Sequence, residues 1–139
     1  KVKYAPGELT AVAFAEDGSE LGRTSLQSGG RETKLALLPE EPCVEKGGLC
    51  FIRLQYTDGK GELKPLARGK IEVNVEGGEL LALGGAAPYN EAGYLGRETD
   101  TYYGEALAVV RARGTVVLRA ASPYGNAEVR VECRAKGEN

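Results

Sequence analysis

The chain has 139 residues and a net charge of −2, the size of one ordinary domain with some extra length. Acidic and basic side chains are mixed, so we expect no partner nucleic acid and no attraction to an anionic membrane surface. No apolar run reaches the roughly 20 residues that cross a bilayer. The chain has no His, Trp or Met, and so lacks the commonest general base and transition-metal ligand.

The first residue is Lys1 rather than Met. We interpret the chain as a piece of a longer polypeptide, and removal of a signal peptide is the alternative. The sequence therefore leaves the compartment open, since a cytoplasmic and a secreted protein fit it equally.

The three cysteines, Cys43, Cys50 and Cys133, make an odd count, which is a poor disulfide framework. Cys50 and Cys133 are in phase with neighbouring apolar residues, which predicts small buried side chains. Cys43 and Cys50 flank a turn-like segment at 45–48, and whether they pair stays open. Because there is no His and no closely spaced pair of thiols, we expect no metal site, and we expect no cofactor.

In chain order, the first predicted element is a β-hairpin at residues 8–27. A β-prone run from Glu8 to Ala15 is followed by Asp17-Gly18, a strong turn signal, and by a return strand at 21–27. Ser28-Gly29-Gly30 then predicts a flexible joint and a domain boundary.

The hairpin needs something to cover, because two strands alone are marginal in water. Leu9, Val12 and Phe14 are its main apolar residues. We expect residues 1–29 to close a preceding β-sandwich domain and, within this chain, to dock laterally on the sandwich that follows.

Short alternating strands with frequent turns predict an all-β fold for residues 30–136, an immunoglobulin-like β-sandwich of about seven strands. The clearest is 70–76, where Ile71, Val73 and Val75 alternate with polar residues. Residues 137–139 are predicted to be a disordered tail. The expected strands are 33–38, 49–57, 70–76, 79–83, 105–112, 115–121 and 127–134.

The long loop at 84–103 carries four of the seven tyrosines, Tyr89, Tyr94, Tyr102 and Tyr103. Loops longer than about 12 residues are uncommon unless they have a role. Tyrosine buries a large area at low entropic cost and keeps a polar tip. The loop therefore predicts a contact surface for a neighbouring domain, a second subunit or a carbohydrate. The alternative is that the rings anchor the loop to its own sandwich.

Several segments together resemble the C-terminal accessory region of the bacterial β-galactosidases of glycoside hydrolase family 2. Tyr4–Phe14, the turn and Gly22-Arg23-Thr24 are similar to that family's Pro-Gly-Glu-Leu-x-Ala-Val-Ala stretch, its turn and its Gly-Arg-Thr return. The likeness continues in order through residues 49–59, 73–84, 103–110 and 114–120.

The resemblance implies that this piece is a non-catalytic scaffold or interaction domain. In that family the catalytic machinery is two glutamates on an upstream barrel, and the partners implied here are other domains of the parent enzyme and a second subunit. Asn90-Glu91 matches the family's acid/base dipeptide only in letters, because it lies in a predicted loop without a second carboxylate on a rigid frame. We therefore expect no catalytic residue here.

Two other functions remain open. The tyrosine-rich loop would suit a carbohydrate-binding module. A repeat of a bacterial surface protein would have the same architecture, although residues 1–29 and 30–136 show no internal similarity.

Overall fold

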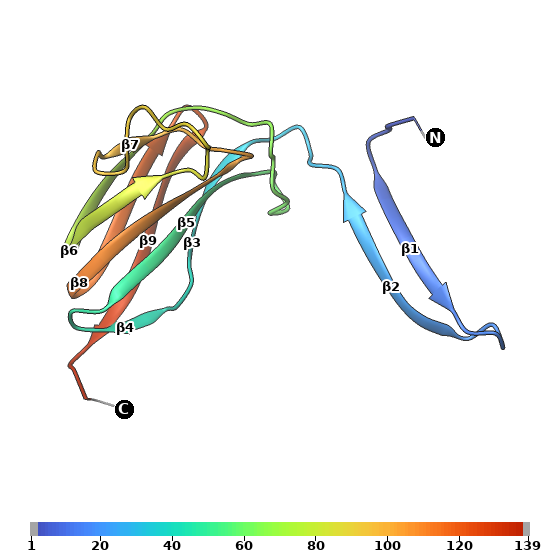
Figure 1. Ribbon diagram of the computed structural model, residues 1–139, viewed down its shortest axis with the longest axis horizontal. Helices are drawn as coiled ribbons and strands as arrows, with labels where there is room; N and C mark the ends of the chain where they lie inside the picture. Colours follow the sequence, from blue (N-terminus) through green and yellow to red (C-terminus); the bar gives the residue numbers. More distant parts are fainter. Residues whose placement is uncertain (1–2, 138–139) are drawn as a thin grey trace.

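The computed structural model describes residues 3–137, which form an all-β protein. Seven strands make a sandwich and two make a hairpin beside it (Figure 1). The predicted all-β sandwich is confirmed, whereas its immunoglobulin-like assignment and the domain limits stay predictions. No helix that could cross a bilayer occurs within the described range, and most of the predicted 137–139 tail lies outside it. The strands are β1 (Glu8–Phe14), β2 (Glu20–Gln27), β3 (Lys34–Pro39), β4 (Cys43–Glu45), β5 (Leu49–Thr57), β6 (Ile71–Gly84), β7 (Glu98–Thr99), β8 (Glu105–Ser122) and β9 (Gly125–Arg134).

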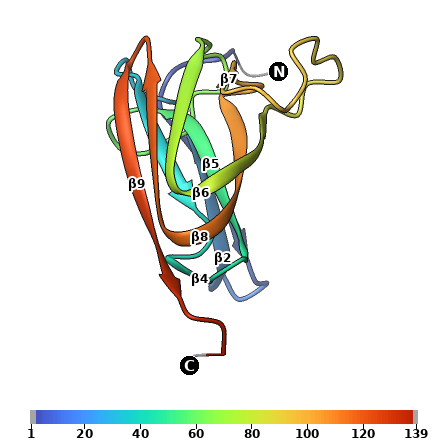
Figure 2. The same cartoon turned by 90° about the vertical axis from the view of Figure 1, so that its left-hand side faces the viewer.

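The two layers of the sandwich are one sheet folded over through its two longest strands. The first half of β6 pairs with the second half of β8, and the second half of β6 pairs with the first half of β8. Both strands bend sharply at one edge of the molecule (Figure 2). The sequence prediction divided each of them into two strands; the segments are present, but each pair is continuous through the bend.

Glycine permits this bend. Glu76 pairs with Val117 and Gly78 with Ala112, so four residues of β8, 113–116, lie opposite the single residue Gly77. Gly77 has a φ of +73°, and a Cβ there would lie 1.8 Å from the carbonyl oxygen of Thr115. No other residue fits so close to a facing backbone.

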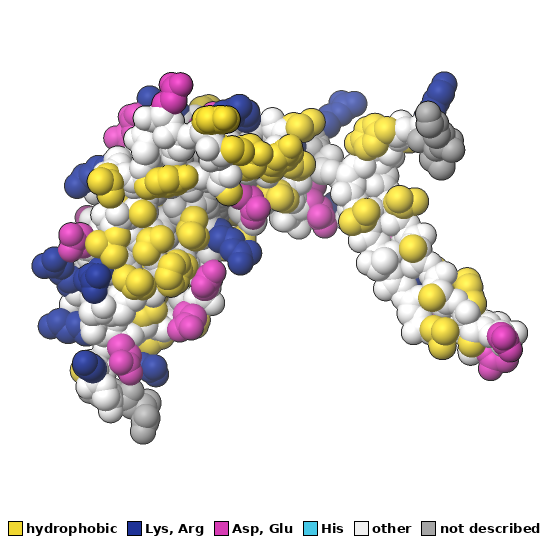
Figure 3. Space-filling model, viewed as in Figure 1, with side chains coloured by type: hydrophobic (Ala, Val, Ile, Leu, Met, Phe, Trp, Pro, Cys, Tyr) yellow, Lys and Arg dark blue, Asp and Glu magenta, His cyan; other side chains and the backbone are white. Residues whose placement is uncertain are grey.

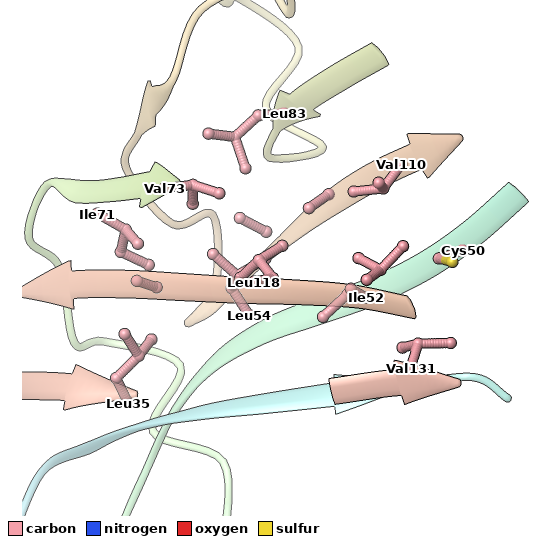
Figure 4. Packing of buried hydrophobic residues seen from close by; sticks show 14 of the residues in the cluster. Leu35, Cys50, Ile52, Leu54, Ile71, Val73, Leu83, Val110, Leu118 and Val131 are labelled. Atoms are coloured by element: carbon pink, nitrogen blue, oxygen red, sulfur yellow. The ribbon is translucent and has the colours of Figure 1, made fainter. Parts of the chain in front are cut away.

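The core lies between the two layers and follows the two-residue period of the strands. Ile52 and Leu54 from one layer face Leu118 and Val131 from the other, and all four are fully buried (Figure 4). The alternation predicted for 70–76 is confirmed, because Ile71 and Val73 are buried while their polar neighbours are exposed.

Tyr56 extends the core to the end of the sandwich. Its ring is fully buried and packs edge-on against Tyr124, with the ring centroids 4.9 Å apart. Its hydroxyl donates to the carbonyl oxygen of Gly69 at 2.7 Å. Burial raises the pKa of Tyr56 to about 12, so this hydroxyl stays protonated as a donor.

Two short edge strands were not expected from the sequence. β4 pairs in parallel with the end of β9, with Val44 opposite Cys133, and β7 pairs with the start of β6. Cys43, Cys50 and Cys133 are all free thiols; Cys50 is buried in the core as predicted, and Cys133 is half-buried against it.

The hairpin does not dock laterally on the sandwich, so that prediction is wrong. β1 and β2 pair only with each other and form a separate two-stranded sheet. Figures 1 and 3 show open space between this ribbon and the sandwich. The physical reason is the link at 28–33, which is tied to the loop after β5 and directs the ribbon away from the sheet edges.

The bend supplies the first test. Gly77→Ala should destabilise the fold by more than about 2 kcal/mol, because Ala would adopt a left-handed conformation and meet a carbonyl oxygen. Gly114→Ala in the same bend has nothing within 4 Å of its Cβ, and should change the free energy of unfolding by less than about 0.5 kcal/mol. Urea unfolding measures both. Equal effects would contradict the role given to Gly77.

The separation of the hairpin from the sandwich supplies a second test. A shortened chain that starts at Ser28 should keep the free energy of unfolding of the sandwich within about 1 kcal/mol, since no hairpin strand pairs with it. Denaturant unfolding followed by Tyr fluorescence measures this. A larger loss would mean that the ribbon supports the sandwich after all.

Candidate interaction surfaces

The hairpin has one mainly polar face, which also carries Val12 opposite Arg23, and one apolar face. On the polar face, Thr10 donates to the Glu8 carboxylate at 2.7 Å and lies 2.7 Å from the Ser25 hydroxyl. The bond from Thr10 is the main reason that the pKa of Glu8 is lowered. This face therefore satisfies its own polar groups.

The opposite face of the hairpin is apolar and uncovered. Leu9 pairs with Leu26, Ala11 with Thr24 and Ala13 with Gly22, so these residues share one side of the ribbon. Leu9 and Leu26 are 71% and 72% exposed. A strand pair with this division of faces is typical of the outer layer of a sandwich, with its apolar side turned to a second layer.

The four loop tyrosines do not act as one group. The Tyr94 ring packs on Gly84, since a Cβ added to Gly84 would lie 2.4 Å from that ring. Tyr102 packs on the next residue, since a Cβ added to Gly85 would lie 3.2 Å from the Tyr102 Cβ. Tyr102 and Tyr103 pack edge-to-face, with centroids 4.7 Å apart. Tyr89 extends alone and is 91% exposed. All four tyrosines are exposed, but Tyr94 and Tyr102 also contact their own sandwich, while Tyr103 and Tyr89 present more of their rings to solvent.

Tyr103 belongs to a shoulder of the sandwich beside the joint. A Cβ on Gly104 would lie 2.6 Å from the Lys64 carbonyl oxygen, so the turn at 102–104 packs directly on the 64–66 segment. Leu66 on that segment is 89% exposed and Tyr103 is 63% exposed. Apolar side chains are visible at this end of the sandwich, which faces the hairpin (Figure 3).

A further apolar patch covers the outer face of β5 and β8, and sequence reasoning missed it. Phe51 pairs with Val109, and Leu107 lies one row away opposite Arg53. Phe51 and Leu107 are each 37% exposed, and Leu49 is 41% exposed. The signal was present in the sequence: alternation fails in Leu49–Phe51 and in Leu107–Val110, and apolar residues on both faces of a strand indicate that both faces are covered.

The Asn90-Glu91 dipeptide lies in a tight turn of the long loop. The Asn90 side-chain amide donates to the Gly93 carbonyl oxygen at 3.0 Å, and Glu91 is exposed. Between residues 3 and 137, no three carboxylate or thiolate side chains gather as a metal site would require.

Comparison with known proteins identifies the family of the chain. The profile described as glycoside hydrolase family 2 C-terminal domain 5 matches residues 40–136. The curated Beta-galactosidase BoGH2A of Bacteroides ovatus is 25% identical over 117 residues, which are 82% of this chain and 14% of that protein. A family 2 glycosyl hydrolase structure from Bacteroides cellulosilyticus DSM 14838 has a TM-score of 0.86 and 28% identity over 94% of this chain and 19% of that one. A β-glycosidase from Bacteroides vulgatus shares the fold, with a TM-score of 0.81 and 20% identity over 94% of this chain and 18% of that one.

The chain thus spans less than a fifth of the length of these relatives. The alignment with the Bacteroides cellulosilyticus structure covers 94% of this chain, which is more than residues 30–136 alone could supply. The superposition therefore includes the hairpin together with the sandwich. The likeness that the sequence suggested is confirmed. The chain belongs to the domain family described as glycoside hydrolase family 2 C-terminal domain 5, and it is a C-terminal accessory domain of the glycoside hydrolase family 2 enzymes.

Proposed function

We propose that this domain is a non-catalytic scaffold and interaction module of a longer, β-galactosidase-like glycoside hydrolase. In this proposal the hairpin at 1–29 is the closing edge of a preceding β-sandwich domain, and the sandwich at 30–136 is held beside that domain. The observation that carries the proposal is the uncovered apolar face around Leu9 and Leu26, each more than 70% exposed.

The energetics favour a covering layer. Full burial of a Leu side chain is worth about 1.5–3 kcal/mol, and a two-stranded ribbon without a second layer is marginal in water. The sandwich does not supply that layer in this chain, because Leu9 and Leu26 stay more than 70% exposed beside it. A sheet of another domain of the same polypeptide would cover it at high effective concentration.

Two more surfaces extend the contact area that this role requires. The shoulder formed by Leu66 and Tyr103 adjoins the joint, and the patch of Phe51, Leu107 and Val109 covers the outer sheet face. We assign the shoulder to contact with the hairpin-bearing domain, and the outer patch to contact with the catalytic domain or a second subunit. Contiguous exposed apolar residues of this kind are typical of interaction sites.

A carbohydrate-binding module is the alternative, and the exposed Tyr103 ring beside Tyr102 favours it. The geometry is less suitable, because the two rings are inclined at 80° and do not form a flat stacking platform. Calorimetric binding of a galactoside or an oligosaccharide that disappears in Tyr103→Ala would favour this alternative over the scaffold.

The isolated 139-residue chain should not hydrolyse an aryl β-galactoside, because the proposal places both catalytic carboxylates elsewhere in the polypeptide. Release of nitrophenol from the nitrophenyl galactoside measures this. Turnover that rises in proportion to the purified chain and is lost in Glu91→Gln would contradict the proposal.

The double variant Leu9→Lys, Leu26→Lys tests the covering layer. Within the longer polypeptide it should destabilise the hairpin-bearing domain by about 3–6 kcal/mol, through lost apolar burial and two buried charges. In the isolated chain it should leave sandwich unfolding unchanged. The matched control Thr10→Lys, Ser25→Lys places the same charges on the polar face and should have little effect in either context. Differential scanning calorimetry compares them, and equal effects of the two double variants would rule out the proposed layer.

A further inference from the structure

The joint between the hairpin and the sandwich contains two glycines, and hydrogen bonds hold most of its residues. On the hairpin side, the Ser28 amide donates to the Gly7 carbonyl oxygen at 2.9 Å and the Gly7 amide donates to the Ser28 hydroxyl at 3.1 Å. The base of the ribbon is thereby closed immediately before Gly29. The mobility of the joint depends on what holds Gly30 and the residues after it.

Asp58 holds Gly30. Asp58 as a residue is 5% exposed, and its Oδ2 accepts the Gly30 amide at 2.8 Å. Oδ1 accepts the amides of Lys60 and Glu62 at 2.8 and 2.9 Å, which fixes the carboxylate in the turn after β5. Together these bonds lower the pKa of Asp58 and keep it ionised, and the bond from Gly30 has the largest effect.

Lys64 holds the next three residues. Its ammonium donates to the carbonyl oxygens of Arg31 and Glu32 at 3.2 and 3.0 Å, and to the Thr33 hydroxyl at 2.7 Å. All three of its protons are therefore directed at the joint. The Lys64 backbone amide donates to the carbonyl oxygen of Tyr56 at 2.8 Å, so this lysine is attached to a fully buried part of the core.

We propose that Asp58 and Lys64 form a lock that fixes the hairpin at one orientation to the sandwich. Ser28-Gly29-Gly30 alone would be a swivel, since glycine places few limits on φ and ψ. Ser28 is tied to the hairpin and Gly30 to the sandwich, and Gly29 between them packs on the Lys64 side chain, whose Cγ would lie 3.4 Å from a Cβ at Gly29. The superposition of a relative over hairpin and sandwich together agrees with a fixed orientation. The lock concerns this chain by itself; its use in placing a neighbouring domain rests on the proposed function.

The test compares the motion of two groups of amides in the isolated chain by ¹⁵N NMR relaxation and residual dipolar couplings. In the wild type, amides at the base of the hairpin, from Leu26 to Ser28, should share one alignment tensor and one correlation time with those of β5 and β8. In the double variant Asp58→Asn, Lys64→Met they should fit a separate tensor and show a shorter correlation time.

The single variants distinguish the lock from general destabilisation. In Asp58→Asn, the side-chain oxygen can still accept the Lys60 and Glu62 amides, whereas the new amide group faces the Gly30 N–H. Hydrogen exchange should therefore accelerate at Gly30 on the order of tenfold, with Lys60 and Glu62 still protected. Lys64→Met keeps the apolar stem and removes only the three donors. Lys60→Met makes the same chemical change two residues from Asp58, at a side chain with no hydrogen bond to the joint, and should leave the tensor unchanged.

Two results would overturn the proposal. One is a wild-type hairpin base that already reorients independently of the sandwich. The other is a double variant that still fits a single tensor while its Gly30 amide exchanges freely. Secondary chemical shifts from Glu8 to Gln27 first establish that the ribbon is paired in the isolated chain. A paired ribbon that reorients counts against the lock and not against the covering layer at Leu9 and Leu26, so the lock and the proposed function can fail separately.

Discussion

The close approach of Gly77 to the backbone of Thr115 is the constraint on which the rest of the sandwich depends. A single sheet has one wet face and one apolar face, and its apolar face needs a second layer. Here β6 and β8 supply both layers by bending together, so the inner residues of one half of each strand meet those of the other half. Without a residue that lacks a Cβ at position 77, the two strands could not turn at the same point and stay paired on either side of it.

The bend also determines which surfaces are left over. Because β6 and β8 turn inward, the outer faces of the two layers and the two ends of the sandwich are what remains for contact. The outer face of β5 and β8 carries Phe51 and Leu107, and the end beside the joint carries Leu66 and Tyr103. The hairpin shares no strand pairing with either layer and keeps its own apolar face open. These surfaces are the ones through which a scaffold domain would act.

Local pattern was enough to predict most strands, and long-range pairing accounts for what the sequence missed. The run 49–57 was predicted with the bounds of β5, and the start of the alternating run 70–76 lies within a residue of the start of β6, because a two-residue period is a property of the segment itself. The continuity of β8 through Arg113-Gly114 depends on its partner β6, and β4 exists only because Val44 meets Cys133 from the far end of the chain. Asp58-Gly59 could be predicted as a turn, but its bond to Gly30, 28 residues away, has no local signature. For the candidate sites, the composition of the loop drew attention to four tyrosines, all of which are exposed. Only packing against Gly84 and Gly85 distinguishes Tyr94 and Tyr102 from the other two.

The proposed lock at the joint and the uncovered ribbon would together have a consequence that neither has alone. A ribbon on a swivel would let its covering domain and the sandwich sample many arrangements, and the exposed shoulder at Leu66 would meet that domain only part of the time. If Asp58 and Lys64 hold the ribbon at one angle, each surface of the sandwich has a fixed position relative to that domain, and contacts at the shoulder are made without further loss of orientational freedom. The conformational entropy of the joint would then be lost only once, when the sandwich folds and Asp58 in the turn after β5 binds the Gly30 amide. In the function proposed for this domain, the short polar joint would therefore matter to its neighbours as much as the apolar surfaces on either side of it.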